Sequence, residues 1–165
     1  MQLNRLLTQM DDAVFCALDA PSDILANASA KLLQDGAYVR WLMGSRMTNK
    51  SSLLDEFSAA LQFPYYFGSN WDAFDECLQQ MVIPDLHSII LLIYDANRVL
   101  QSQPEQLQTF IASIEDARHA YQRPAFQGMP WQHFCVPFHI ILQANAKDVT
   151  KWREAGASIA WLDIP

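Results

Sequence analysis

The feature that most restricts the fold of this chain is an uninterrupted apolar run, Ile89-Ile90-Leu91-Leu92-Ile93. A strand with one face in water alternates apolar and polar residues, whereas a strand covered on both faces is apolar throughout. The run therefore predicts a central strand over residues 88–94, in a sheet with helices on both faces.

Other short apolar runs alternate with helical patterns, which is typical of an α/β protein with a largely parallel sheet. A layered sheet of about three to five strands is expected. Its other strands are predicted at residues 13–18, 37–43 and 138–143, and residues 158–162 can add an edge strand.

Helices are predicted from the spacing of apolar residues and from the residues that begin and end helices. A capping box from Ser102 to Glu105 predicts the start of a long helix that runs to about Tyr121. The other predicted helix ends are Gly36, Pro64 and, after a helix over residues 148–155, Gly156.

Length and composition suit a single domain over residues 1–165. A chain of 165 residues, 51% of them hydrophobic, buries roughly 70% of the surface that its unfolded form exposes. Residues 122–137 contain three prolines and one glycine. This stretch is too irregular for a helix or strand, so we predict a loop there.

The charge of the chain narrows the classes of partner. Asp and Glu number 18 against 11 Lys and Arg, which gives a net charge of -7. Such a molecule repels nucleic acid and attracts basic proteins. No apolar run reaches the roughly 18 residues that a membrane span needs, and the polar N-terminus does not resemble a signal peptide. We therefore expect a cytoplasmic protein that binds neither nucleic acid nor a membrane directly.

The cysteines and glycines indicate no bound cofactor. Cys16, Cys77 and Cys135 lie far apart and match no metal-binding spacing, so reduced core thiols are expected. With only 5 glycines, the chain contains neither G-x-G-x-x-G nor G-x-x-x-x-G-K-[ST], the loops that hold nucleotide phosphates. Neither a metal site nor a cofactor is predicted.

The most unusual segment reads Phe63-Pro64-Tyr65-Tyr66-Phe67-Gly68-Ser69-Asn70-Trp71-Asp72-Ala73-Phe74-Asp75-Glu76-Cys77-Leu78. It predicts a loop followed by a helix that Ser69 caps. At about 100° per residue the helix has an apolar face and an acidic face. The apolar face is Trp71, Phe74, Cys77, Leu78 and Met81, and the acidic face is Asp72, Asp75, Glu76 and Gln79.

Three carboxylates this close together repel one another, although the helix dipole compensates in the first turn. The acidic face therefore indicates either a solvated helix surface or a site for a basic partner. Tyr65, Tyr66 and Phe67 precede it, and rigid aromatics beside charge are typical of protein interfaces. At least one of the three is expected to pack against the core instead.

The segment resembles the signature of the barstar family, F-P-x-Y-x-G-x-N-x-D-A-x-x-[DE]-C-L. A looser similarity covers residues 37–143, in the order strand, helix, signature helix, strand, helix, strand. Residues 1–36 resemble the N-terminal strand and helix of longer members, and residues 144–165 form a C-terminal helix and strand addition. The resemblance implies a barstar-like layered fold.

The same resemblance implies a protein inhibitor that places carboxylates in the active-site groove of a basic secreted ribonuclease, where RNA phosphates would bind. By position in the motif, Tyr66, Asp72 and Glu76 are the expected partner-binding residues, with Trp71 and Asp75 as their neighbours. Residues one helical turn apart are separated by about 5–6 Å, which is similar to the spacing of neighbouring phosphates on a nucleic-acid strand. Asp72 and Glu76 have that spacing.

A further acidic contact is implied on the following helix, where Ile114-Glu115-Asp116-Ala117 resembles the family segment that provides it. That contact falls on Asp116. Barstar itself has tryptophan in place of Asp75 and aspartate in place of Glu76. A nuclease other than barnase, or a different toxin, is therefore the expected partner.

Two alternatives remain beside ribonuclease inhibition. A catalytic function would use His87, His119, His133, His139, Cys77 or Cys135, and these form no recognised catalytic motif. We predict no catalytic residue. The second alternative is a barstar-like adaptor, or an immunity protein that binds a toxin of another chemistry, because a fold does not specify a function.

Overall fold

A single parallel sheet lies at the centre of the computed structural model, which describes residues 1–10, 13–81, 83, 87–123 and 135–163. Its strand order is β2-β3-β4-β1-β5, and all neighbouring strands are parallel. The strands are β1 (Phe15–Leu18), β2 (Tyr38–Met43), β3 (Ile89–Tyr94), β4 (Phe138–Gln143) and β5 (Ile159–Trp161). The predicted parallel α/β sheet is confirmed, including its C-terminal edge strand.

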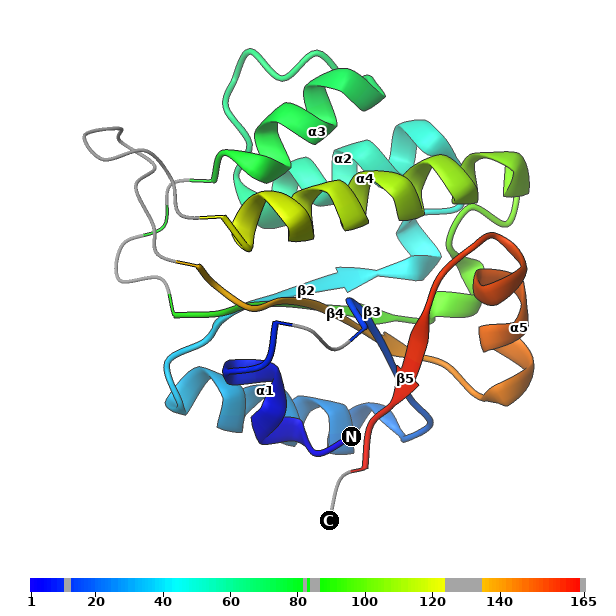
Figure 1. The fold of residues 1–165 in the computed structure, drawn as a ribbon. Helices are drawn as coiled ribbons and strands as arrows, with labels where there is room; N and C mark the ends of the chain where they lie inside the picture. Colours follow the sequence, from blue (N-terminus) through cyan, green and yellow to red (C-terminus); the bar gives the residue numbers. More distant parts are fainter. Residues whose placement is uncertain (11–12, 82, 84–86, 124–134, 164–165) are drawn as a thin grey trace.

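Helices cover both faces of the sheet (Figure 1). One face carries α1 (Ser22–Gln34), and the opposite face carries α2 (Lys50–Leu61), α3 (Trp71–Gln79) and α4 (Leu107–Tyr121). A fifth helix, α5 (Ala146–Glu154), connects β4 to β5. The 3-10 helices are Leu3–Leu7, Gly44–Arg46, Ala96–Arg98 and Pro104–Gln106. In the described part of the chain, no helix is long and apolar enough to cross a membrane.

The continuous apolar run of β3 is explained by two separate cores. Ile89, Leu91 and Ile93 point into the core beneath α2, α3 and α4. Ile90 and Leu92 point into the core on the side of α1. All five are fully buried, because successive side chains of a strand leave opposite faces of the sheet.

The first strand of the chain is an interior strand of the sheet. β1 lies between β4 and β5, and its four residues are all buried. Gln143, at the end of β4, ties the carboxyl ends of three strands together: its Nε2 donates to Ala20 O at 3.1 Å, and its Oε1 accepts from Asp95 N at 3.3 Å. The strand before residue 37 is therefore part of the central sheet, and the helix after it covers one face.

Helix ends agree with the sequence in some places and differ in others. Gly36 and Gly156 follow α1 and α5 with φ of +90° and +105°, as expected for glycines that end helices. The predicted capping box at Ser102 is wrong, because α4 begins at Leu107 without a side-chain cap. A residue before α4 instead binds the start of α2: Gln103 Oε1 accepts a hydrogen bond from Lys50 N at 2.8 Å.

The cysteine prediction is correct for only one residue. Cys16 is buried, whereas Cys77 is half-buried and Cys135 is exposed; all three are free thiols. The predicted core position of Cys135 is wrong. This residue lies in the connection between α4 and β4, where its side chain is exposed. Most of the predicted loop over residues 122–137 lies outside the described residues.

Replacing Gly44 tests the close contact between the ends of β2 and β3. A Cβ at Gly44 would lie 2.2 Å from Asp95 O and 2.7 Å from Tyr94 O, both of them main-chain atoms. We expect Gly44→Ala to lower the free energy of unfolding in urea more than Gly156→Ala. The second change has open space and is strained only by its positive φ, at about 1–2 kcal/mol. Equal losses would show that the two strand ends can separate at little cost.

Candidate partner-binding site

The loop before α3 divides its aromatic residues between core and solvent. Phe67 packs edge-on against Phe63 at 5.2 Å, and Phe63 packs against Phe74 at 6.0 Å, between ring centres. Tyr65 is 101% exposed and Tyr66 is 70% exposed, with their rings 5.5 Å apart. The prediction that at least one aromatic of this loop packs against the core is confirmed by Phe67. The two tyrosines present a large apolar surface to solvent.

The start of α3 is held by Asn70, and the predicted cap at Ser69 is wrong. Asn70 Oδ1 accepts from Ala73 N at 2.9 Å, and Asn70 Nδ2 donates to Gly68 O at 3.1 Å. Ser69 has φ of +48°, a conformation outside the extended region that N-cap residues adopt. One asparagine therefore closes the loop and begins the helix.

The apolar face of α3 attaches the helix to the core. Phe74 and Leu78 are fully buried, and Met81 beyond the helix is 8% exposed. Trp71 is half-buried, with its ring 5.7 Å from that of Phe74. Its Nε1 donates to Gln106 Oε1 at 2.9 Å. Trp71 thus joins α3 to the turn that precedes α4.

The C-terminal end of α3 is fixed by a buried tyrosine from α4. Tyr121 Oη donates to the main-chain oxygen of Leu78 at 2.9 Å. Burial raises the pKa of Tyr121 well above its usual value, so the hydroxyl keeps its proton and its role as donor. With Trp71 at the other end, this contact sets the orientation of α3 on the core.

Two of the acidic residues on α3 face solvent. Asp72 and Glu76 are exposed and lie one helical turn apart. Asp75, which we predicted on the same face, is half-buried. Its Oδ1 is buried and accepts no hydrogen bond from a described residue. The acidic face is therefore narrower than the sequence pattern indicated.

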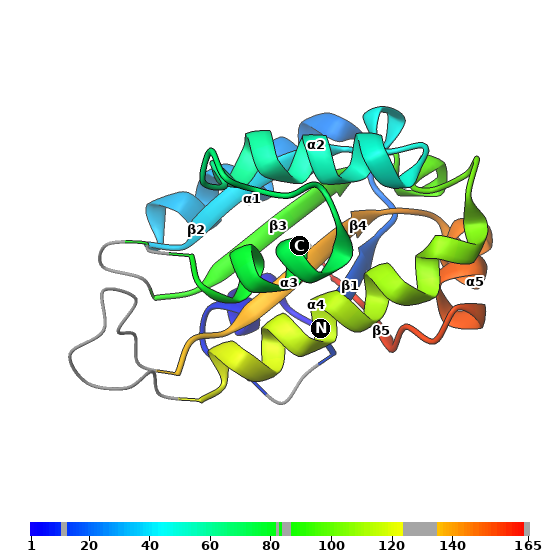
Figure 2. The same cartoon turned by 90° about the horizontal axis from the view of Figure 1, so that it is seen from above.

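None of these carboxylates is neutralised within the described chain. The described salt bridges join Met1 to Asp163, Arg46 to Glu56 and Arg118 to Glu115. Asp116 is also exposed, on α4, which packs directly against α3 (Figure 2). The structure thus places the predicted acidic residues on two neighbouring helices.

Within the described part of the chain, the histidines and cysteines that a catalytic site would use differ in burial. Burial, and next the charge of Glu76, raises the pKa of the Cys77 thiol, which opposes the thiolate that a nucleophile requires. His87 and His119 are exposed, and His139 is buried in β4. Among the described residues, no three His, Cys, Asp or Glu side chains are arranged to hold a metal ion. His133 lies outside the described residues.

Two residues that shape the site were missed by the sequence analysis. Asn70 had a usable signal, because asparagine caps helices as well as serine does. No signal in the sequence indicated Gln106. It accepts a hydrogen bond from a tryptophan 35 residues earlier in the chain, and such a pairing leaves no local pattern.

Comparisons with known proteins agree with the signature. The family model of barstar, described as a barnase inhibitor, matches residues 37–143 of the chain. No curated protein matches it. Among solved structures, the fold is similar to the crystal structure of Cdc6p from Pyrobaculum aerophilum, with a TM-score of 0.54 and 16% sequence identity. That similarity covers 96% of this chain and 41% of the other, and at this identity it shows the fold alone.

Removing the cap of α3 should distinguish Asn70 from Ser69. We expect Asn70→Ala to reduce the free energy of unfolding by about 1 kcal/mol, the usual cost of losing an N-cap side chain. Ser69→Ala should have a much smaller effect, because its hydroxyl makes no capping bond. Urea denaturation of both variants measures the difference, and a larger loss in Ser69→Ala would reverse the assignment.

Replacing Trp71 should act mainly on stability. We expect Trp71→Ala to cost about 3 kcal/mol, at the low end for a core aromatic because the ring is only half-buried. Trp71→Phe keeps much of the ring contact and loses the bond to Gln106, at about 1 kcal/mol. A Trp71→Ala variant with unchanged melting temperature but impaired partner binding would instead assign this ring to the interface.

Proposed function

The chain belongs to the barstar family, and we propose that it is a protein inhibitor that blocks the active site of a basic ribonuclease. The family match spans residues 37–143, more than half of the chain, and includes both helices that carry the exposed carboxylates. On this proposal the chain is a binding protein and not an enzyme. Its partner is a secreted ribonuclease or toxin, and the inhibitor acts in the cytoplasm.

The observation that carries the proposal is the pair Asp72 and Glu76 on the solvent side of α3. Both are exposed and lack a salt bridge to a described residue, so their charges are available to a partner. Arginine and lysine in a phosphate-binding groove attract carboxylates as they attract phosphates. Because α3 is fixed at both ends, its two carboxylates are presented at a constant spacing of one helical turn.

The exposed tyrosines supply the apolar part of the proposed interface. Tyr66 occupies the position of the tyrosine in the family signature, and Tyr65 beside it is fully exposed. Aromatic side chains near the centre of an interface contribute much of the binding free energy, while surrounding charges set orientation and association rate. We assign Asp116 on α4 to the acidic rim of the same surface.

Asp75 and Glu76 adapt the surface to a partner other than barnase. A half-buried carboxylate with an unpartnered oxygen is costly unless a donor reaches it. Asp75 is such a group, so we propose that a basic or hydrogen-bonding side chain of the partner approaches it. Trp71, one helical turn before Asp75, packs against Phe74.

Neutralising the two exposed carboxylates tests the proposal. We expect the wild-type chain to inhibit RNA cleavage by a basic secreted ribonuclease of the guanyl-specific type with one-to-one stoichiometry. The double variant Asp72→Ala, Glu76→Ala should bind more weakly, by about 30-fold or more for each carboxylate if both are hot spots. Calorimetry measures the affinity, and a fluorogenic RNA substrate measures the inhibition across a panel of such enzymes that includes barnase.

A matched control removes the same charge from the opposite face of the sheet. Asp23→Ala, Asp35→Ala changes two exposed carboxylates at α1 and should leave inhibition nearly unchanged. Equal affinities for the two double variants would contradict the assignment of the site to α3. Tight binding of a basic toxin without inhibition of any ribonuclease in the panel would favour the adaptor over the inhibitor.

A further inference from the structure

The two edges of the sheet differ in how their outward main-chain groups are bound. At the β5 edge, the amino group of Met1 donates to Trp161 O at 2.6 Å, and Asp163 N donates to Met1 O at 2.8 Å. On the same strand, Arg153 Nη2 donates to Ile159 O at 3.4 Å. Other parts of the chain therefore cover the β5 edge.

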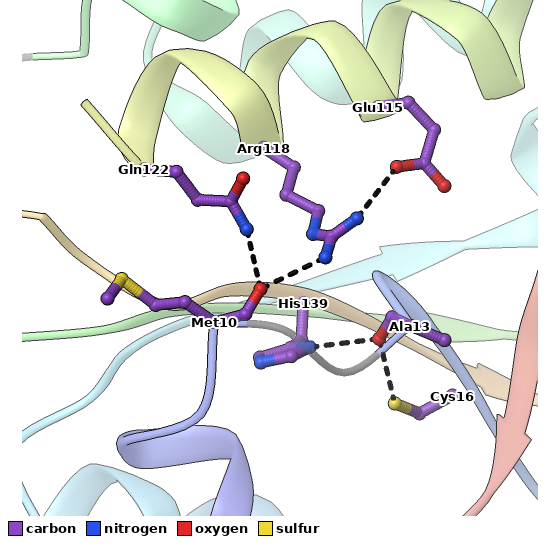
Figure 3. A network of polar contacts seen from close by, with 7 residues as sticks. All are labelled: Met10, Ala13, Cys16, Glu115, Arg118, Gln122 and His139. Carbon is purple, nitrogen blue, oxygen red and sulfur yellow. Dashed lines mark hydrogen bonds and ion pairs between the residues drawn. The ribbon is translucent and has the colours of Figure 1, made fainter.

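The segment that covers the β5 edge is also attached to the rest of the molecule. Arg118 Nη2 and Gln122 Nε2, both from α4, donate to Met10 O at 3.0 Å and 2.5 Å (Figure 3). Nearer the N-terminus, Leu3 and Leu6 are buried in the core on the α1 side. The β5 edge is thus closed by a segment that is itself fixed to the core.

The opposite edge is formed by β2, which has β3 as its one strand neighbour in the described sheet. Tyr38 N donates to Ser88 O at 2.8 Å. This bond directs the main-chain groups of Tyr38, and of every second residue after it, at β3. The N–H and C=O groups of Val39, Trp41 and Met43 therefore point away from the sheet. Another strand can pair with outward groups of this kind.

Two of the outward groups on β2 are bound by charged side chains. Val39 O accepts from Arg40 Nη1 at 2.8 Å, and Met43 N donates to Glu56 Oε1 at 3.0 Å. The Arg40 guanidinium also stacks over Tyr38, 3.9 Å from its ring centre, which holds it along the strand. A cation thus caps an acceptor near one end of β2, and an anion caps a donor at the other end.

Trp41 lies midway between these capped groups. Its main-chain N–H and C=O form no hydrogen bond with a described residue. The residue is 43% exposed, and its Nε1 donates to Ser29 Oγ on α1 at 3.2 Å. One helical turn after Ser29, and on the same side of α1, Leu33 is 42% exposed. The open part of the edge therefore has an exposed apolar flank.

A second copy of the chain complements this edge when the two β2 strands run antiparallel about a two-fold axis at Trp41. A residue with an open donor and an open acceptor then forms two identical bonds with the same residue of the other copy. In this register, Val39 of one copy lies opposite Met43 of the other. The capped acceptor and the capped donor are therefore partners in the next pair of ladder bonds.

The side chains that cap the edge are also complementary across this axis. When Met43 N of one copy bonds Val39 O of the other, Glu56 of the first copy and Arg40 of the second are released at the same place. Their opposite charges can form an ion pair, and the two-fold axis repeats it. An extended peptide of unrelated sequence would lack these two charges in register, so the pattern favours a second copy of this chain.

We propose that the chain forms a two-fold dimer through the outer edge of β2, centred on Trp41. The contact joins two five-stranded sheets into one continuous sheet. The acidic residues of α3 and α4 lie over one face of the sheet (Figure 1) and take no part in the proposed contact. The dimer is therefore independent of the inhibitor function proposed above.

Two measurements on the full wild-type chain test the dimer. Sedimentation velocity should show the mass changing from one chain to two as the concentration rises from low micromolar to submillimolar. Hydrogen exchange followed by NMR should show slower exchange of the Trp41 amide in the dimer, because this N–H has no bond to a described residue in the monomer. A chain that stays monomeric over this range, or a dimer without slower exchange at Trp41, would overturn the proposal.

Two substitutions of Trp41 separate the main-chain bonds from the indole contact. Both Trp41→Ala and Trp41→Pro remove the ring, and the proline also removes the outward N–H. Edge strands tolerate proline where the lost N–H faces solvent. We expect the dissociation constant of the dimer to be about tenfold higher for Trp41→Pro than for Trp41→Ala, since two symmetry-related bonds are lost. Equal dissociation constants for the two variants would contradict pairing through this residue.

Charge reversal tests the two-fold register. Arg40→Glu and Glu56→Arg each place like charges at both symmetry-related positions, so each variant alone should be monomeric where the wild type is dimeric. Mixing the two variants restores opposite charges at both positions and should restore the dimer in sedimentation. A mixture that stays monomeric, with both variants folded by circular dichroism, would show that the register is wrong. If Glu56→Arg does not fold, the exchange of the wild-type Trp41 amide still decides.

Discussion

Burial of β3 on both faces is the constraint on which the rest of the structure depends. Because its side chains are apolar in both directions, each face of the sheet must be covered by helices. α3 is one of the covering helices, and it is attached by Phe74 and Leu78. The attachment determines which side of α3 faces water. The exposure of Asp72 and Glu76 follows from the packing of the central strand.

In the proposed site, a helix that is held at both ends presents a charged surface. Asn70 fixes the beginning of α3, and the Tyr121 hydroxyl fixes its end through a bond to the carbonyl of Leu78. Such preorganisation lowers the entropy lost on binding. The two exposed tyrosines in the preceding loop lie beside this fixed helix. A partner would therefore meet an acidic and aromatic surface that needs little rearrangement.

The N-terminal region is integrated with the family core. β1 occupies an interior place in the sheet, and the segment before it is contacted by side chains from α4 and β4. Arg118, which holds Met10, is also paired with Glu115, next to Asp116. The attachment of the N-terminal segment thus lies on the same helix as one of the proposed partner contacts. Helix α4 therefore contacts both the N-terminal segment and α3.

The sequence by itself determined the order of helices and strands and the acidic face of α3. Both follow from periodicities of two or about 3.6 residues, which are local properties of a chain. The tertiary structure decided the position of β1 between β4 and β5, the half-burial of Asp75 and the choice of Asn70 over Ser69 as the cap. It also decided that one histidine meets two carbonyls more than 120 residues away in the sequence. Contacts of that range depend on how complete elements pack against one another, and no local pattern encodes them.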